Sequence, residues 1–146
     1  MRGWGAGTAV LIGAGAVLAS AALPAAAVEK APVERSRAVV VVDCARNPQV
    51  RPGSYMIACG DGNNALASLH WSQWNRSGAV GAGRNLVNDC IPACSSGHFH
   101  SYPVSVRLDR ARPWAGHHGR SHFTRLSVTY TSARPPHAPR TETFDV

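Results

Sequence analysis

Residues 104–109 (VSVRLD) and residues 125–130 (RLSVTY) alternate apolar and polar side chains without interruption. Successive side chains of a β-strand point to opposite faces, so each stretch predicts a strand with one buried face and one solvated face. Strands of this one-sided kind are typical of antiparallel sheets. Shorter stretches of similar character surround them, separated by turn signals, and no long amphipathic helix is evident. We therefore predict an all-β fold, a small antiparallel sandwich or barrel.

The other expected strands lie nearer the amino terminus. Residues 38–42 (AVVVV) form a largely β-branched run that predicts the first strand, and residues 54–59 alternate like the two longer stretches. Residues 66–74 fit either a strand or a short helix, because their two tryptophans also have helical spacing. Residues 75–78 (NRSG) are a candidate hairpin turn, after which residues 79–87 would return along the sheet.

The first 27 residues have the three-part layout of a secretory signal peptide. Arg2 is the sole charge before Glu29, an apolar run rich in small residues follows it, and an A-x-A cleavage pattern ends at Ala27. We predict an apolar signal helix that is removed after Ala27, and a retained single-span anchor is the alternative. No basic stop-transfer cluster follows the run, which favours cleavage and secretion to the extracellular space.

The remaining chain divides into three expected parts. Residues 28–37 carry Glu, Lys, Pro and Arg with little apolar periodicity and predict a flexible leader. Residues 38–132 are the expected β domain. Residues 133–146 contain three prolines and predict a flexible tail.

All four cysteines lie in the part of the chain that remains after cleavage, namely Cys44, Cys59, Cys90 and Cys94. An even number of cysteines in an oxidising compartment predicts two disulfides. A domain of this size benefits from them, because it buries only a modest fraction of its surface. Of the three possible connectivities we favour Cys44–Cys59 with Cys90–Cys94, and a crossed pairing stays open.

A face without bulky side chains is expected opposite two tryptophans. Ala79, Gly81 and Gly83 alternate along one strand, so Trp71 or Trp74 could lie across that face. An exposed tryptophan beside glycine could form a shelf for a sugar ring or another ligand. We prefer the interpretation that both tryptophans fill the core, because a small domain needs bulky apolar side chains.

The loop at residues 60–64 (GDGNN) holds short oxygen-bearing side chains. Asp61 and Asn63 could bind a ligand or, with Asn88 and Asp89, a calcium ion. The loop lacks the additional carboxylates and the terminal Glu of an EF-hand. We prefer turn chemistry, in which the Asp and Asn side chains bind their own backbone.

Histidines form the other group of candidate ligands, namely His98, His100, His117, His118 and His122. The first two would lie on one face of a strand, and the His117–His118 pair in the loop between the two alternating strands. Converging imidazoles would bind Zn or Cu, and Cys90 and Cys94 could complete a zinc site with the first pair. We prefer scattered surface histidines and expect no cofactor, because no carboxylate-rich surround is evident. No Gly-x-Ser-x-Gly elbow or other nucleophile signature supports an enzyme.

The chain is basic, with 15 Lys+Arg, 8 Asp+Glu and a formal net charge of +7 at pH 7. This excess favours an acidic cell-envelope polymer as a partner, and an extracellular protein is the other partner considered. A solvated basic surface is the interpretation we prefer, because the arginines are spread along the chain without a dense cluster. There is no specific nucleic-acid signature, and no membrane span is expected after signal cleavage.

Five segments carry a resemblance to other proteins: residues 48–52 (PQVRP), 58–63 (ACGDGN), 69–74 (LHWSQW), 88–94 (NDCIPAC) and 97–104 (GHFHSYPV). Together they resemble a family of small secreted proteins of actinobacteria, whose members are described only as secreted or hypothetical proteins. The resemblance covers most of the chain after residue 42. It implies secretion and an intact fold, and it implies no activity, substrate or catalytic residue.

From these observations we expect a secreted, non-enzymatic β module that binds a protein, an envelope polymer or a small ligand. The candidate contact residues are Trp71, Trp74, Asp61 and Asn63. The alternative is a metal-binding protein or a metal-dependent hydrolase that uses the histidines named above. A small secreted protease inhibitor is a second alternative, suggested by size and by the two bridges.

Overall fold

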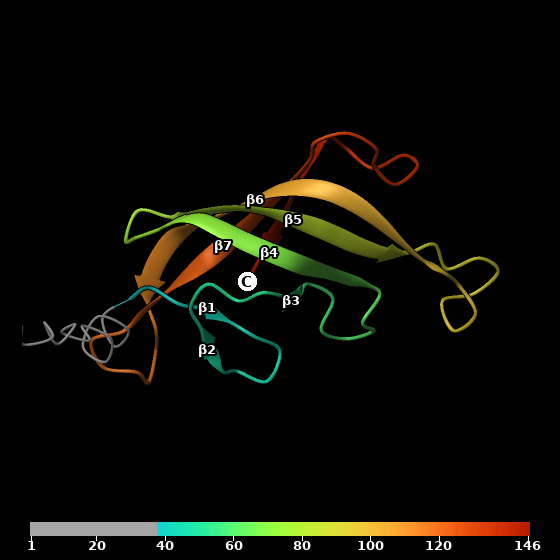
Figure 1. Cartoon of the computed structure of the whole chain (residues 1–146). Helices are drawn as coiled ribbons and strands as arrows, with labels where there is room; N and C mark the ends of the chain where they lie inside the picture. Colours follow the sequence, from blue (N-terminus) through green and yellow to red (C-terminus); the bar gives the residue numbers. More distant parts are fainter. Residues whose placement is uncertain (1–37) are drawn as a thin grey trace, which may run out of the picture.

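The structure, a computed structural model, describes residues 38–146 (Figure 1). The regular secondary structure in this part of the chain consists of β-strands alone. The expected signal peptide (residues 1–27) and leader (residues 28–37) lie outside the described residues. The predicted all-β fold class is confirmed, with antiparallel sheets that form a curled half-barrel and with two disulfides. In this part of the chain no helix has the length and apolar character needed to cross a membrane.

The strands follow one another as β1 (Val41–Val42), β2 (Pro48–Gln49), β3 (Tyr55–Met56), β4 (Asn64–Trp74), β5 (Ala79–Asn88), β6 (Phe99–Pro113), β7 (Ser121–Tyr130) and β8 (Thr141–Asp145). β1 and β2 form a two-stranded sheet, and β3 to β8 form a six-stranded antiparallel sheet in chain order. Short turns suffice to connect such neighbours. The predicted turn closes the β4–β5 hairpin, where the N–H of Asn75 donates to the carbonyl of Gly78 at 3.0 Å.

The concave face of the six-stranded sheet carries most of the core, and the chain around β1, β2 and β3 lies below it (Figure 1). The inward residues of β6 and β7 pair as Val104 with Tyr130, Val106 with Val128 and Leu108 with Leu126. Each of these six side chains is at most 2% exposed. The alternation in residues 104–109 and 125–130 therefore divides buried from solvated positions, as predicted.

The residues before β1 join the sheet at the start of β7. Val40 pairs in parallel with His122. Its N–H donates to the carbonyl of Ser121 at 3.1 Å, and its carbonyl accepts the N–H of Phe123 at 2.8 Å. Strand β8 pairs with β7 only from Arg125 onward. Along one edge of β7 the hydrogen-bonding partner therefore changes from β8 to Val40.

Trp71 and Trp74 of β4 attach the amino-terminal part of the domain to the sheet. The indole N–H of Trp71 donates to the carbonyl of Pro52 at 2.8 Å, and that of Trp74 to the carbonyl of Val39 at 2.7 Å. Trp71 pairs with Gly81 and lies over it, so the predicted bulk-free face of β5 does receive a tryptophan. Residues 66–74, which fitted a strand or a helix, belong to a strand.

The expectation of a flexible tail at residues 133–146 was wrong for its last part. Residues 141–145 form β8, in which Phe144 pairs with Leu126 and packs against the core. The local sequence signal is weak, because the segment is short and holds one large apolar residue after three prolines. Pairing with β7, which is distant in the sequence, makes the segment a strand.

Candidate functional site

The two disulfides have the connectivity that we favoured. Cys44–Cys59 joins the turn after β1 to the loop between β3 and β4, and Cys90–Cys94 closes the loop between β5 and β6. No cysteine of the described chain is free. The zinc site that would use Cys90 and Cys94 is therefore wrong.

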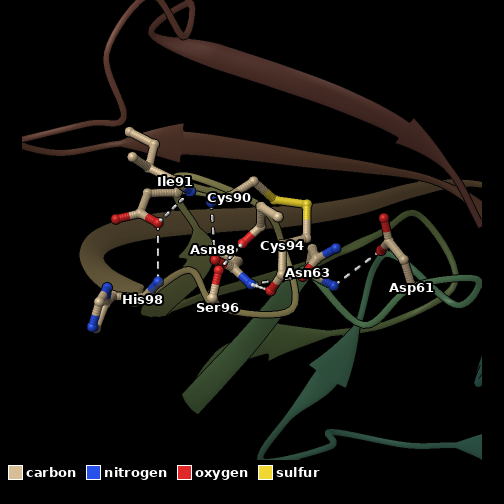
Figure 2. The surroundings of a disulfide bond; sticks show 10 residues. Asp61, Asn63, Asn88, Cys90, Ile91, Cys94, Ser96 and His98 are labelled. Carbon is tan, nitrogen blue, oxygen red and sulfur yellow. Dashed lines mark hydrogen bonds between the residues drawn. A yellow bond between two sulfur atoms is a disulfide. The ribbon is translucent and has the colours of Figure 1, made fainter.

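Amide side chains hold the loop that contains Cys90–Cys94 (Figure 2). Asn88 Nδ2 donates to Asn63 Oδ1 at 2.9 Å and to the carbonyl of Cys94 at 2.8 Å. Asp61 Oδ1 accepts the N–H of Asn63 at 3.0 Å, and this backbone hydrogen bond holds the pKa of the Asp61 carboxyl below its usual range. The candidate ligand residues Asp61 and Asn63 are thus engaged in the turn chemistry that we preferred.

The candidate histidines do not come together. His98 immediately precedes β6, His100 is the second residue of this strand, and the His117–His118 pair lies in the loop after its end, so most of β6 separates the two pairs. His100 Nε2 instead lies 2.9 Å from Asp89 Oδ2. Within residues 38–146 no group of three or more His, Cys, Asp or Glu side chains could hold a metal ion. The Zn or Cu site considered from the sequence is therefore wrong.

The two tryptophans of β4 pack as core residues. Their rings meet edge-to-face with centroids 4.8 Å apart, and Trp74 meets Phe123 in the same way at 5.6 Å. Both rings pack against the buried cluster, and both indole N–H groups already have carbonyl acceptors. Both tryptophans are half-buried, so their packing agrees with the core interpretation that we preferred.

An open cleft of about 490 Å³ lies beside the start of β7, where Val40 takes the place of β8 as the hydrogen-bonding partner of that strand. The turn after β1 and Tyr55 of β3 line one part of it, and the end of β6, Trp114 and His122 line another. Strand β8 contributes Asp145. The cleft thus exists because three distant parts of the chain meet around the start of β7.

A second hollow, of about 380 Å³, lies within the loop between β6 and β7 and shares Pro113 and Trp114 with the cleft. The loop is closed by a hydrogen bond from the N–H of Trp114 to the carbonyl of Arg120 at 2.9 Å. Gly116 and Gly119 have φ values of +78° and +71°, a left-handed conformation that glycine adopts without strain. Two tight turns therefore place Trp114 between the two hollows.

Trp114 is the centre of a cluster of flat side chains. It is only 6% exposed. The ring of His117 stacks on it with centroids 3.5 Å apart and an interplanar angle of 13°, and the ring of His122 lies 6.2 Å away. The guanidinium carbon of Arg120 lies 5.7 Å from the centroid of the Trp114 ring, in the range of a cation–π contact. The cluster fixes Arg120 and His122 beside the cleft and the loop hollow.

Two nitrogens of this cluster are buried without a hydrogen-bond partner, Arg120 Nε and His122 Nδ1. In the part of the chain that the structure describes, they are the only buried side-chain nitrogen or oxygen atoms in this condition. A buried polar group without a partner costs about 1–3 kcal/mol, so an acceptor bound beside such a group stabilises the protein. The Arg120 Nε–H can only donate, so what it lacks is an acceptor.

The charges that line the two hollows differ: Arg46 in the cleft is accompanied by Asp43 and Asp145, whereas Arg120 in the loop hollow is accompanied by no carboxylate. Burial, and then the positive charge of Arg46, lower the pKa of His122, so its ring is neutral at pH 7 and one ring nitrogen carries a proton. Asp43 is already engaged, because its carboxylate accepts the N–H groups of Ala45 and Asn47 at 2.9 and 2.7 Å. Those hydrogen bonds lower the pKa of the Asp43 carboxyl. The loop hollow, which is lined by Arg120 and by no carboxylate, is therefore the more favourable of the two for an anion.

The hydroxyl of Tyr55 is also satisfied within the wall of the cleft. It donates to the carbonyl of Val42 at 3.0 Å. Burial and the nearby carboxylate of Asp43 raise its pKa to about 12, so it stays protonated. Tyr55 therefore shapes the wall of the cleft. His122 lines the same cleft, and Arg120 lines the loop hollow.

Sequence reasoning selected His117 and His122, but as metal ligands, and it missed Trp114, Arg120 and Arg46. The sequence did contain a signal for this loop, namely a Gly-His-His-Gly segment between Trp114 and Arg120. Both glycines permit tight turns, which bring the Trp and the Arg together. The meeting of this loop with the turn after β1 leaves no local pattern in the sequence. No family model, no curated protein and no solved structure matches this chain.

Proposed function

We propose that this protein is a secreted, non-enzymatic β module that binds an anionic group of an acidic cell-envelope polymer in the loop hollow beside Trp114. The observation that carries the proposal is Arg120, whose Nε is buried without an acceptor and whose side chain lines a hollow that contains no carboxylate. A carboxylate, phosphate or sulfate oxygen in this hollow would give the guanidinium group the acceptor that it lacks.

The residue types fit this ligand. A guanidinium group presents planar donors that match carboxylate and phosphate oxygens, and it is more weakly hydrated than an ammonium group. Arg120 is also held against the ring of Trp114, so little of its conformational freedom is lost on binding. Arg46 adds a second positive charge near His122.

Secretion is part of the same proposal. The two disulfides suit an oxidising compartment, where they persist. The signal-peptide pattern at residues 1–27 and the actinobacterial resemblance support the same location. An acidic envelope polymer is the partner that such a protein would meet at high local concentration.

Titration with sulfate tests the proposal, because sulfate keeps a constant charge across the accessible pH range. In NMR spectra of the oxidised protein we expect saturable shifts of the Arg120 Nε–H signal and of the His122 ring. Arg120→Lys keeps the charge but removes the Nε–H donor, and it should weaken sulfate binding about tenfold.

The matched control is Arg134→Lys in the loop between β7 and β8, which should bind sulfate like the unmodified protein. Equal binding by the two lysine variants would refute the proposal. Shifts that spread over many arginines without saturation would refute it as well.

A further inference from the structure

Exposed arginines lie along β6 and lead to the loop hollow. Arg107, Arg110 and Arg112 are all exposed, and Pro113, which follows them, lines the loop hollow. An extended chain advances about 3.3 Å per residue, so the stretch from Arg107 to Arg112 is about 17 Å long. The sequence pattern alone did not indicate this surface, because these three arginines lie within a strand of otherwise ordinary composition.

The exposure of Arg110 and Arg112 results from a break in the strand. Regular alternation would place both on the inward face with Leu108, which is 2% exposed. Arg110 instead has a φ of 55°, in the left-handed region, which interrupts the alternation. A non-glycine residue in this conformation is uncommon, and here it turns basic side chains to solvent.

The turn between β4 and β5 adds another arginine to this end of the sheet. Ala79 pairs with Leu108, and a Cβ built on Gly78 would stand 3.8 Å from Nη2 of Arg107. Arg76, in the same turn, is exposed. Figure 1 shows the β4–β5 turn and the β6–β7 loop at the same end of the sheet.

Acidic side chains do not neutralise this surface. Asp109 is shared by two arginines, with Arg125 Nε at 2.6 Å from Oδ1 and Arg107 Nε at 3.1 Å from Oδ2. One negative charge therefore serves two positive ones. Among residues 38–146 no salt bridge involves Arg110 or Arg112.

We infer that the ligand is a linear polyanion, which lies along β6 from Arg107 to Arg112 and places one anionic group in the loop hollow at Arg120. This inference rests on the proposed function and extends it from a single anionic group to a chain of them. The repeated group is a phosphate or a carboxylate, the two oxyanions that guanidinium groups bind through paired donors.

Nucleic acid is the less favoured polyanion, because its binding sites combine positive charge with aromatic rings on which bases stack. The exposed large apolar side chains of the described chain are Val50, Met56, Ile91 and Phe99, and none belongs to the arginine-bearing half of β6. Trp114 lies close to it but is covered.

Chain length is the variable that tests the inference. Dissociation constants are measured for tripolyphosphate and long-chain polyphosphate, and for trigalacturonate and polygalacturonate, at several salt concentrations. We expect the long chains to bind more tightly per chain than the trimers. The double variant Arg110→Gln/Arg112→Gln should reduce this advantage about tenfold and make the salt dependence shallower by about two charges.

The control is Arg134→Gln/Arg140→Gln, which removes two exposed arginines from the loop between β7 and β8. Equal losses in both double variants, or no advantage of long chains over trimers, would overturn the inference. In either case saturable sulfate binding at Arg120 would still support the proposed function. If sulfate does not bind at Arg120, both the proposed function and the polyanion inference are refuted. Tighter binding of single-stranded DNA than of both other polyanions at equal charge would overturn the assigned ligand class. The phosphate and carboxylate series distinguish the two sources of the anionic group.

Discussion

The six-membered ring of Trp71 lies directly on Gly81. A Cβ built at this glycine would stand 3.0 Å from Cε3 of Trp71 and 2.7 Å from the carbonyl oxygen of His70. Both distances are shorter than ordinary van der Waals contacts, so only a residue without a side chain permits β4 and β5 to hold the tryptophan in this position.

Gly81→Ala should therefore destabilise the protein by about 1–3 kcal/mol, because the backbone of β4 must move to admit the methyl group. Urea unfolding measures the change. Gly60→Ala is the control, since a Cβ there has no atom within 4 Å, and it should stay within about 0.5 kcal/mol of the parent. Equal stability of the two variants would show that the packing of Trp71 on β5 is loose.

The two disulfides should contribute unequally to stability. Cys44–Cys59 spans 15 residues of sequence and Cys90–Cys94 spans 4, and the longer loop loses more entropy on closure. Replacing Cys44 and Cys59 by Ser should cost about 3 kcal/mol, and the same change at Cys90 and Cys94 should cost less. Thermal unfolding of the two double variants measures the order, and the reverse order would contradict it.

A buried hydroxyl links three strands of the sheet. The hydroxyl of Tyr130 lies 2.8 Å from Asn85 Oδ1 and 2.7 Å from Glu142 Oε2, so it connects β7 with β5 and β8. Tyr130→Phe leaves the buried amide of Asn85 without this contact and should cost about 1–3 kcal/mol. Tyr102→Phe is the matched control on the neighbouring, half-buried ring. If both phenylalanine variants unfold at the same urea concentration, the hydroxyl contributes nothing.

Acid should weaken the loop that carries Cys90–Cys94. The hydrogen bond from His100, and then the N–H groups of His98 and Ile91, lower the pKa of Asp89 to about 2. A carboxyl whose pKa is lower in the folded state stabilises the fold above its ordinary value near 3.8, and this contribution is lost as the pH falls toward 2. Asp89→Asn should flatten the dependence of the urea midpoint on pH in this interval. An unchanged slope in Asp89→Asn would contradict this role.

Sulfate affinity should increase as the pH falls. Burial, and then the charge of Arg46, hold the pKa of His122 below the usual histidine value of 6.5, and an anion bound nearby favours the protonated ring. Calorimetric titrations between about pH 7 and pH 5 should show progressively tighter binding, because protonation of His122 adds a positive charge to the site. His122→Gln should bind sulfate with little dependence on pH. A constant affinity in the unmodified protein would mean that the anion does not contact this ring.

Local patterns were sufficient for the parts of the fold that depend on neighbouring residues. The alternation in residues 104–109 and 125–130 predicted two central strands, and the small residues at Gly81 and Gly83 predicted the place of a tryptophan. The pairing Cys90–Cys94 followed from its short spacing. In each case the interaction that decides the structure lies within one strand or between adjacent strands.

The cleft could not be predicted in this way. It forms because Val40 pairs with His122 and because β8 leaves the edge of β7 after Arg125, and neither event has a signature in a short stretch of sequence. The metal site considered for the histidines could not be judged from the sequence for the same reason, since spacing along the chain does not reveal that β6 separates the two pairs. Residues 141–145 were assigned to a tail because their strand partner lies in another part of the chain.

The order of the strands has a consequence for how the protein folds. Every pairing in the six-stranded sheet joins strands that are consecutive in the chain, so each is closed at a small cost in loop entropy. The contact of Val40 with His122 joins opposite ends of the described chain and has the largest such cost. The cleft is then completed late in folding, after the meander exists. A molecule bound in the cleft stabilises the last contact to form. It therefore binds the fully folded domain in preference to a sheet whose amino-terminal segment has not yet docked.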